Sequence, residues 1–362
     1  MTSADRLVQL AGAALVGLVL ADVFFTVLFP ASGSGPVRRP LSRWVWRSFR
    51  LLGRRLRPPR RHRLLAYSGP VQITATIAVW VLLVTAGWAM VFQPALGTAV
   101  VATDGSTDTG WATALYVSGF SLTTLGTGDV VPITAPYRLF MIMEAGLGLS
   151  GFTLVLTYFL SVYGTITQHK TSAALLHQRT FCTGDPVQLI VGLADDGALP
   201  GAGQELSWLA DLLGRTYQTH HSYPVLRYFH YRDAQYTLPR LLLLSLDTTA
   251  LLRSALDGQR YRTLLRSPGL EMVSSTGLQL LEELIPHAGC EPSEDEEQDW
   301  RRHFTQAAAR LRAAGIDIPT DVATSCQEYL SLRARWNQPL RSLAEAMLYE
   351  WSEIDPLSRP ST

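Results

Sequence analysis

Residues 123–129, Thr-Thr-Leu-Gly-Thr-Gly-Asp, are the part of the chain whose residue types and spacing best suit binding chemistry. Two glycines alternate with other residues, and one carboxylate, Asp129, ends the segment. Glycine readily adopts positive φ, so successive carbonyl oxygens in such a segment can point to the same side. A row of carbonyl oxygens can replace the hydration shell of a cation. The segment therefore has the composition of a cation-coordinating strand.

Two other interpretations of a glycine-rich run fit less well. A phosphate-binding loop ends in Gly-Lys-Ser or Gly-Lys-Thr and joins a strand to a soluble helix, and no such continuation follows Gly128. An ordinary hairpin turn leaves unexplained the short apolar segment 111–122 that precedes the glycines.

Long apolar runs surround this segment and predict a membrane protein. A helix needs about 20 apolar residues to cross a hydrocarbon core of about 30 Å. Three ranges are long enough, namely 7–29, 71–92 and 138–166. The range 111–122 is too short, which fits a half-helix that enters the membrane and turns back at 123–129. Irregular backbone at membrane depth is tolerated only where it is buried in protein or lines water.

The sequence Ser-Leu-Thr-Thr-Leu-Gly-Thr-Gly-Asp-Val-Val-Pro-Ile-Thr-Ala-Pro-Tyr-Arg (121–138) resembles the pore signature of tetrameric potassium channels. The usual form of that signature is Thr-Thr-Val-Gly-Tyr-Gly-Asp. The resemblance covers residues 70–168, in the order outer helix, pore half-helix, selectivity filter and inner helix. It implies a homotetramer, because a ring of carbonyl oxygens needs four chains and each chain supplies one filter strand.

The resemblance also assigns roles to single residues. The backbone carbonyls, with one Thr hydroxyl, would bind potassium at Thr124, Leu125, Gly126 and Thr127, and Gly128 would close the turn. Asp129 takes the position of the family's Asp at the outer mouth. Gly148 stands where the family has its inner-helix hinge. A small-residue packing face that includes Gly146 and Gly151 is the alternative for Gly148.

Two departures from the family pattern concern the rigidity of the filter. Thr127 replaces the filter Tyr, and the aromatic pair usual in the pore helix is Tyr116 and Val117 here. In typical members the filter Tyr hydrogen-bonds to a pore-helix aromatic, so this chain lacks both partners of one contact. Selectivity for potassium survives this change if it depends on the number and field of the carbonyls, and weakens if it depends on a rigid cage.

Two carboxylates fall inside the apolar runs. An intramembrane carboxylate is energetically costly and marks a functional candidate. For Glu144 we expect partners among the hydroxyls of Ser118, Ser121 and Thr123, which makes Thr123 and Glu144 candidates for filter support rather than ion binding. Asp22 is expected to pair with an Arg of the segment that follows.

An Arg-rich segment between the first two apolar runs predicts orientation. Residues 38–63 contain 11 Arg and no acidic residue, and Arg-rich short loops remain cytoplasmic. The chain is then a multi-pass protein of the cell membrane with its N-terminus outside and its C-terminal half in the cytosol. Arg at steps of three or four, with an apolar stripe, predicts an amphipathic interfacial helix that binds anionic lipids. Voltage sensing would require further sheltering helices, and only one span precedes this segment.

The second half of the chain has a different chemistry from the first. Residues 1–170 contain 13 Arg and 1 Lys against 6 acidic residues, whereas residues 171–362 contain 17 Arg against 24 acidic residues. Apolar periodicity predicts cytosolic helices. Their ranges are 202–219, 238–256, 273–288, 299–315, 320–336 and 339–354.

The second half shows no identifiable ligand site. A dinucleotide-binding glycine fingerprint is absent from the sequence. The spacing of His220, His221 and His230 fits no metal site, so a packed helix junction is expected there. The acidic range 291–299 is expected to be a solvated linker capping a helix that starts near Trp300. No catalytic motif is found, and we expect no enzymatic activity, no nucleic-acid partner and no cofactor other than potassium ions in the filter.

The sequence thus predicts an all-α membrane protein with a potassium-channel-like pore domain, an extra N-terminal transmembrane helix and a mainly α-helical cytosolic domain. Its predicted function is conduction of monovalent cations, with potassium favoured, gated by the inner helix and the cytosolic domain. The alternatives are a weakly selective cation channel and a non-conducting scaffold or sensor. The predicted parts are 1–30 (first transmembrane helix), 31–68 (interfacial segment), 69–168 (pore domain with helices 71–92, 111–122 and 138–166 and filter 123–129) and 169–362 (cytosolic domain).

Overall fold

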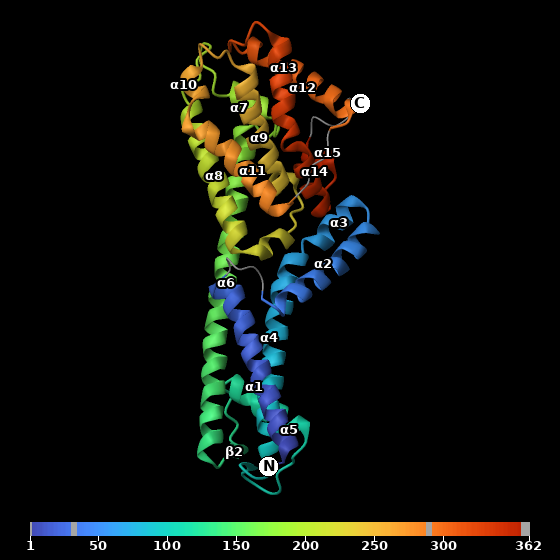
Figure 1. Ribbon diagram of the computed structural model, residues 1–362, viewed down its shortest axis with the longest axis vertical. Coiled ribbons are helices and arrows are strands. Elements are labelled where there is room, and N and C mark those ends of the chain that lie inside the picture. Colours follow the sequence, from blue (N-terminus) through green and yellow to red (C-terminus); the bar gives the residue numbers. More distant parts are fainter. Residues whose placement is uncertain (1, 30–34, 287–291, 356–362) are drawn as a thin grey trace. The chain divides into compact units, whose positions relative to one another are not determined.

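A computed structural model describes residues 2–29, 35–286 and 292–355 of the chain. Helices dominate it (Figure 1), so the predicted all-α fold class is confirmed. Among the described residues, three helical stretches are long and apolar enough to cross a membrane, namely Ser3–Leu28, Pro58–Ala95 and Ala135–Arg179. Each overlaps one of the three apolar runs of the sequence, and the first ends one residue before the predicted run 7–29 does.

Contacts between residues divide the chain into two compact units. The first, which we call the pore unit, comprises residues 1–55, 67–164 and 222–229. The second, the helical unit, comprises residues 56–66, 165–221 and 230–362. Each unit thus contains a segment from the other half of the sequence. The short range 56–66 lies between two membrane segments in the sequence, yet it packs with the C-terminal helices.

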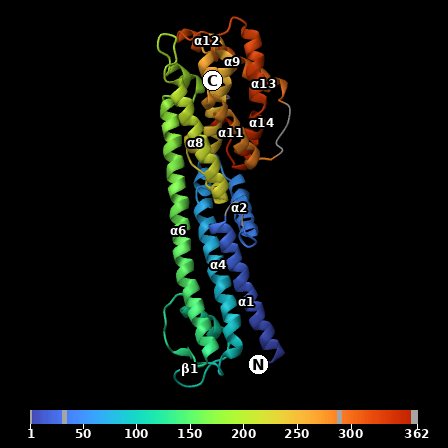
Figure 2. The same ribbon diagram turned by 60° about the vertical axis from the view of Figure 1, so that its left-hand side comes forward.

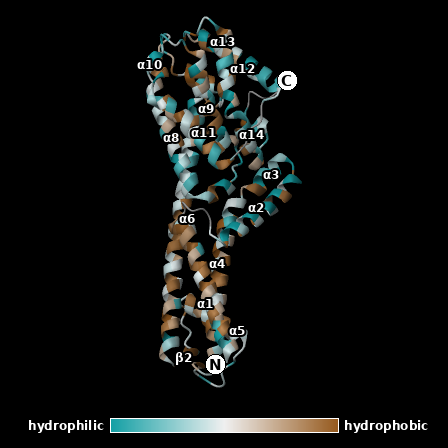
Figure 3. Cartoon of the chain, viewed as in Figure 1, coloured by the Kyte–Doolittle hydropathy of each residue, from teal (hydrophilic) through white to brown (hydrophobic). Residues whose placement is uncertain are grey.

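The pore unit contains the long apolar helices together with two shorter helices. These are α1 (Ser3–Val23), extended by a π-helical turn (Phe24–Leu28), α2 (Arg38–Arg54), α4 (Ser68–Phe92), α5 (Trp111–Leu122) and the first part of α6 (Ala135–Arg179). Helices α1 and α4 lie side by side (Figures 1 and 2). Hydrophobic residues follow α1, α4 and the first part of α6, whereas α2 is largely hydrophilic (Figure 3).

A small apolar core holds α5 in place within the pore unit. Trp88 and Phe92 of α4 pack with Val117 and Phe120 of α5, and all four side chains are buried. Two short antiparallel strands, β1 (Val100–Ala102) and β2 (Val130–Pro132), pair on either side of α5 in the sequence. The residues between α5 and β2 are therefore held at both ends.

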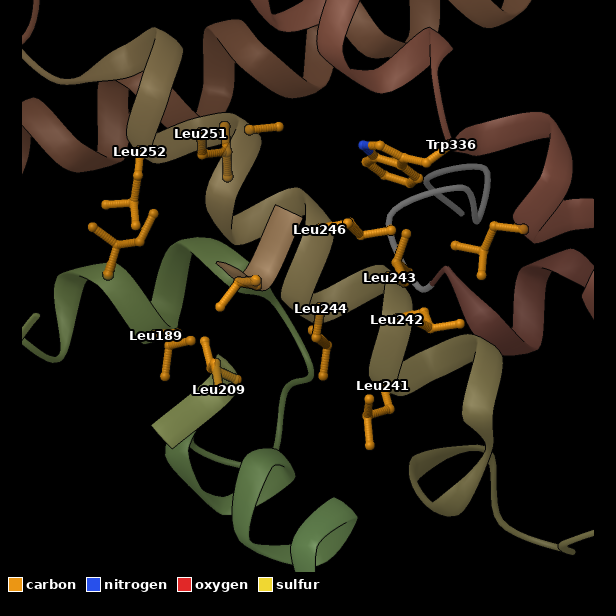
Figure 4. Close-up of a cluster of buried hydrophobic side chains, with 14 of the residues drawn as sticks. Leu189, Leu209, Leu241, Leu242, Leu243, Leu244, Leu246, Leu251, Leu252 and Trp336 are labelled. Atoms are coloured by element: carbon orange, nitrogen blue, oxygen red, sulfur yellow. The ribbon is translucent and has the colours of Figure 1, made fainter. Parts of the chain in front are cut away.

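The helical unit is built around α9. Its helices are α3 (Pro58–Leu65), the rest of α6, α7 (Pro186–Val191), α8 (Ala202–Ser222), α9 (Leu238–Ala255), α10 (Arg262–Leu265), α11 (Pro268–Leu284), α12 (Glu294–Ala313), α13 (Val322–Ala334), α14 (Asn337–Ala346) and α15 (Trp351–Ile354). Helix α9 is buried along almost all of its length. Its leucines point to several sides, towards Leu189 and Leu209 on one side and Trp336 on another (Figure 4). The leucine run in α9 is therefore core rather than a membrane span.

Several helices differ from their predicted bounds for local reasons. The Arg-rich segment forms two helices instead of one, because Pro58 and Pro59 lack the N–H groups needed to continue α2 and instead occupy the first turn of α3. Helix α6 extends as one helix from residue 135 to 179, beyond the predicted 138–166.

The acidic range before Trp300 is helical and not a linker, over the residues that the structure describes there. Ser293 caps α12 through a reciprocal pair of hydrogen bonds with Glu296, so the helix starts at Glu294. Four acidic residues occupy its first turn, where the helix dipole favours negative charge. The acidic residues from Glu294 onwards therefore form the first turns of α12, and the prediction of a linker there is wrong.

Candidate functional site

The segment 123–129 begins at the end of α5, whose start is fixed by a carboxylate. Asp108 accepts hydrogen bonds from the Gly110 N–H at 3.0 Å and from the Thr113 hydroxyl at 2.7 Å. The hydrogen bond from Thr113 lowers the pKa of Asp108. At the other end of the helix, Leu125 N–H donates to the Phe120 carbonyl at 2.9 Å.

The backbone of the segment alternates in handedness. Thr124, Gly126 and Gly128 have φ angles of +58°, +60° and +76°. Leu125 and Thr127, between them, are not among the residues with positive φ. Positive φ at every second residue turns consecutive peptide planes in opposite senses, which lets consecutive carbonyls face the same side. Residues 123–129 are exposed within one chain, so a ligand or other chains can reach this segment.

The C-terminal end of the segment is held by hydrogen bonds from side chains and backbone. The Thr127 hydroxyl donates to Asp129 Oδ1 at 2.6 Å. This hydrogen bond, with a smaller contribution from the Tyr116 hydroxyl, lowers the pKa of the Asp129 carboxyl group. The Asp129 carbonyl accepts from the Thr103 N–H at 2.8 Å. Only two positions separate Thr127 from Asp129, so this contact is local in the sequence.

The buried Glu144 of α6 lies against the pore helix. Its Oε1 is 2.5 Å from the Ser118 hydroxyl, which also lies 2.9 Å from the Thr85 carbonyl oxygen of α4. Ser121 also interacts with the Glu144 carboxyl group. The third hydroxyl expected there, that of Thr123, donates instead to the Gly119 carbonyl at 2.7 Å. Glu144 thus contacts two of its three expected partners, and Ser118 links α5 to both α4 and α6.

Gly148 of α6 lies against the last residue of the pore helix. A Cβ atom at Gly148 would overlap the carbonyl oxygen of Leu122. At Gly146 and Gly151 an added Cβ would have no neighbour within 4 Å in the chain. Thr123, Thr124 and Gly148 border a cavity of about 590 Å³ that is also lined by residues of α1 and α4. The absence of a side chain at Gly148 thus permits close approach of the inner helix to the pore helix.

Comparison with known proteins agrees with this arrangement. Residues 77–165 match a protein family described as "Ion channel". This part of the chain is therefore similar to ion channels with two membrane helices and a pore loop. The resemblance that was based on residues 70–168 is thereby confirmed at the level of the family.

One further relative extends the comparison beyond the ion channel domain. The chain is 27% identical over 229 residues to the "Uncharacterized membrane protein YdjJ" of Bacillus subtilis (strain 168). The alignment covers 61% of this chain and 62% of the relative, which is less than two thirds of either protein. No solved structure matches the chain.

Next to the ion channel domain, Asp22 of α1 has different partners from those expected. Its buried carboxylate accepts from the Trp80 indole N–H at 2.7 Å and from the backbone N–H groups of Val37 and Arg38 at 2.6 and 3.2 Å. The pairing with the Arg-rich segment thus uses the backbone at the start of α2, where N–H groups lack helical partners. Asp22 thereby ties the extra helix α1 to both α2 and α4.

Proposed function

We propose that the protein is a homotetrameric channel of the cell membrane that conducts monovalent cations, with potassium preferred, through residues 123–129. The observation that carries the proposal is the alternation of positive φ at Thr124, Gly126 and Gly128. Four such strands around one axis would present rings of carbonyl oxygens, with the Thr124 hydroxyl at the inner end. Potassium ions would bind at Thr124, Leu125, Gly126 and Thr127 by exchanging water for these oxygens.

The exposure of the segment supports assembly of several chains. Residues 123–129 are exposed in one chain, although irregular backbone cannot face lipid. Large apolar side chains of α6, among them Ile142, Leu149 and Phe152, are also exposed within one chain, at 67%, 63% and 70%. Contacts between copies would cover the segment and part of α6, and a closed ring is the usual form of homo-oligomers.

Selectivity depends on how the filter is supported. Thr127 and Asp129 form a hydrogen bond within one strand, in place of the aromatic contact expected in typical family members. Potassium preference then rests on the number and dipole strength of the carbonyls. A weakly selective cation channel is the alternative if this support is too loose.

The Arg-rich helix α2 supports the proposed orientation and a lipid partner. Arg39, Arg43, Arg47, Arg50 and Arg54 occur in α2 without any acidic residue. Trp44 is 73% exposed, and Leu51 and Leu52 are more than half exposed. Such a helix suits an interface with anionic lipid headgroups on the cytoplasmic side. The N-terminus would then be outside and the helical unit in the cytosol.

Gating would involve α6, which continues from the pore unit into the helical unit as one helix. In this proposal the helical unit has no catalytic role. It acts on the inner helix near Gly148, where α6 lies against the Leu122 carbonyl at the end of the pore helix.

The test is cation flux from liposomes that contain the purified protein, with cross-linking to establish the number of chains. We expect potassium efflux from wild-type tetramers and from Gly119→Ala, because Gly119 is helical and an added Cβ would meet no atom within 4 Å. Gly126→Ala should abolish flux, since alanine is strained at positive φ. Cross-linked wild-type tetramers without any cation flux would refute conduction and favour a non-conducting scaffold.

A further inference from the structure

The short helix α3 is tied to the C-terminal residues of the helical unit by a chain of hydrogen bonds. His62 Nδ1 lies 2.7 Å from His230 Nε2, and His62 Nε2 lies 2.9 Å from Glu353 Oε1. Both histidines are buried, and the Tyr349 ring stacks on His230 at 4.2 Å between centroids. These residues come from three separate places in the sequence, namely α3, the segment before α9 and the C-terminal stretch 349–353. We call this group the His62 cluster.

The positions of the hydrogen-bond acceptors determine which ring nitrogens of His62 and His230 carry a hydrogen. His230 Nδ1 lies 3.1 Å from the Met347 carbonyl oxygen, which can only accept, so Nδ1 carries a hydrogen. In a neutral imidazole the other nitrogen then accepts, so His62 Nδ1 must donate to His230 Nε2. His62 Nε2 faces a Glu353 carboxylate oxygen, which also accepts. Both nitrogens of His62 therefore carry hydrogens, and the ring is positively charged.

The alternative is a proton on Glu353 instead of His62. The second Glu353 oxygen, Oε2, accepts from the Glu350 N–H at 2.9 Å. Burial raises the pKa of Glu353, but the hydrogen bonds from His62 and from the backbone outweigh burial and lower it overall. Burial, with the neighbouring His62, lowers the pKa of His230 to about 3, so His230 stays neutral. The charges are thus positive on His62 and negative on Glu353.

The remaining charged and titratable neighbours of the His62 cluster are few among the described residues. Arg61 precedes His62 on α3 and pairs with Glu350 at 3.1 Å. Glu350 is half exposed, so this pair is screened by solvent. The Tyr349 hydroxyl is held by Tyr231, donating to its carbonyl at 3.0 Å, and burial raises the pKa of Tyr349. The pair of His62 with Glu353 is the more buried of the two ion pairs, at 9% and 26% side-chain exposure.

We propose that a proton on His62 locks α3 onto the C-terminal helices, and that loss of this proton releases α3 and makes the channel respond to cytosolic pH. The channel part of this proposal rests on the proposed function. Helix α3 ends at Leu65 and α4 begins at Ser68, so any movement of α3 is passed on through only two residues to a membrane helix. Loss of the His62 proton leaves Nε2 facing a carboxylate without a donor, which turns an attraction into a repulsion.

The lock has an upper and a lower pH limit. Loss of a proton from His62 removes one of the two ring hydrogens that reach Glu353 and His230. The pKa of His230 is 6.5 in an ordinary environment and about 3 in the folded unit. As pH falls below 6.5, the unfolded chain therefore binds a proton at His230 that the folded unit does not bind. Folding stability then declines. Protonation of Glu353 at low pH removes the ion pair as well. The lock is therefore closed only while His62 is protonated and Glu353 is ionised.

The test measures backbone hydrogen exchange of residues 58–66 in the full-length protein in nanodiscs, from about pH 5 to about pH 9, corrected for the intrinsic pH effect. In the wild type, protection should fall by about tenfold as pH rises, because a hydrogen bond to a charged group is lost. His62→Gln and Glu353→Gln should each show low protection at every pH. Glu350→Gln, which alters the exposed neighbouring pair and keeps an oxygen acceptor, should behave as the wild type.

Two results would overturn the lock. One is pH-independent protection of residues 58–66 in the wild type, and the other is an equal effect of Glu350→Gln and Glu353→Gln. The electrical readout is separate. Open probability in planar bilayers should vary with cytosolic pH in the wild type and lose this dependence in both His62→Gln and Glu353→Gln. A wild type without current at any pH would refute the proposed function, whereas the exchange data would still decide the lock.

Discussion

The side chains of Ser118 and Glu144 lie 2.5 Å apart, joining the pore helix to the inner helix inside the apolar part of the pore unit. Ser118 has one hydroxyl hydrogen and two acceptors in reach, the Thr85 carbonyl and the Glu144 carboxyl group. If Ser118 donates to Thr85, the hydrogen shared with Glu144 must come from Glu144. A neutral carboxyl group also avoids the cost of a buried unpaired charge.

From this relationship we expect Glu144→Gln to be tolerated, because an amide can also donate to the Ser118 oxygen. Its effect on the unfolding free energy should be below about 1.5 kcal/mol. Glu144→Ala should destabilise the protein by about 2 to 5 kcal/mol, since it leaves a cavity between the pore helix and α6. Thermal unfolding in detergent measures both. An equal loss of unfolding free energy in Glu144→Gln and Glu144→Ala would show that Glu144 is held as a charged group.

Gly148 and Gly146 of α6 differ in their surroundings, so substitutions at the two positions can be compared directly. Gly148→Ala should destabilise the pore unit by about 1 to 3 kcal/mol and alter gating, because the added methyl group overlaps the Leu122 carbonyl. Gly146→Ala should be neutral or stabilising by up to about 1 kcal/mol, because a Cβ added at Gly146 meets no described atom within 4 Å. Thermal stability and single-channel open times are the measurements. Identical behaviour of the two variants would favour a hinge role that does not depend on close packing.

The filter brace can be tested through its pH dependence. The Thr127 hydroxyl holds the pKa of Asp129 below its usual value, so Asp129 remains ionised at lower pH than an isolated carboxyl group. Thr127→Val removes this hydrogen bond and should move the loss of current with external acid to higher pH. Thr127→Ser keeps a hydroxyl and should match the wild type. Unchanged acid sensitivity in Thr127→Val would show that Asp129 does not depend on Thr127.

Helix α2 gives a prediction about lipids. Replacing Arg43, Arg47 and Arg50 by Gln should weaken the association with anionic lipid by roughly 1 kcal/mol per Arg. The measurement is the fraction of anionic over zwitterionic lipid that copurifies with the protein, at low and high salt. Salt should reduce this enrichment in the wild type and have less effect in the variant. Equal enrichment in both proteins would remove the lipid partner proposed for α2.

The sequence predicted the membrane part more fully than the helical part, for physical reasons. Lipid demands long apolar helices, so the three spans follow from composition, and the bounds of α5 agree with the predicted 111–122. The positive φ angles of Gly126 and Gly128 follow from residue type, but that of Thr124 does not, because threonine rarely adopts it. This angle depends on the surrounding structure.

Contacts between residues far apart in the chain could not be predicted from the sequence. Asp22 pairs with Trp80, and His62 pairs with residues almost three hundred positions later, such as Glu353. Neither spacing follows a local period, because both depend on how helices pack. The assignment of residues 56–66 and 222–229 to their units has the same cause.

The central claim is that residues 123–129 form a cation-selective pore, and the most direct test is a reversal potential in planar bilayers. The purified tetramer is recorded with potassium on one side and sodium on the other, at equal concentrations. The account predicts cation current with a reversal potential shifted towards the potassium equilibrium potential, in the wild type and in Thr127→Ser. A reversal potential at zero would contradict potassium preference, and the absence of current from intact tetramers would contradict conduction itself.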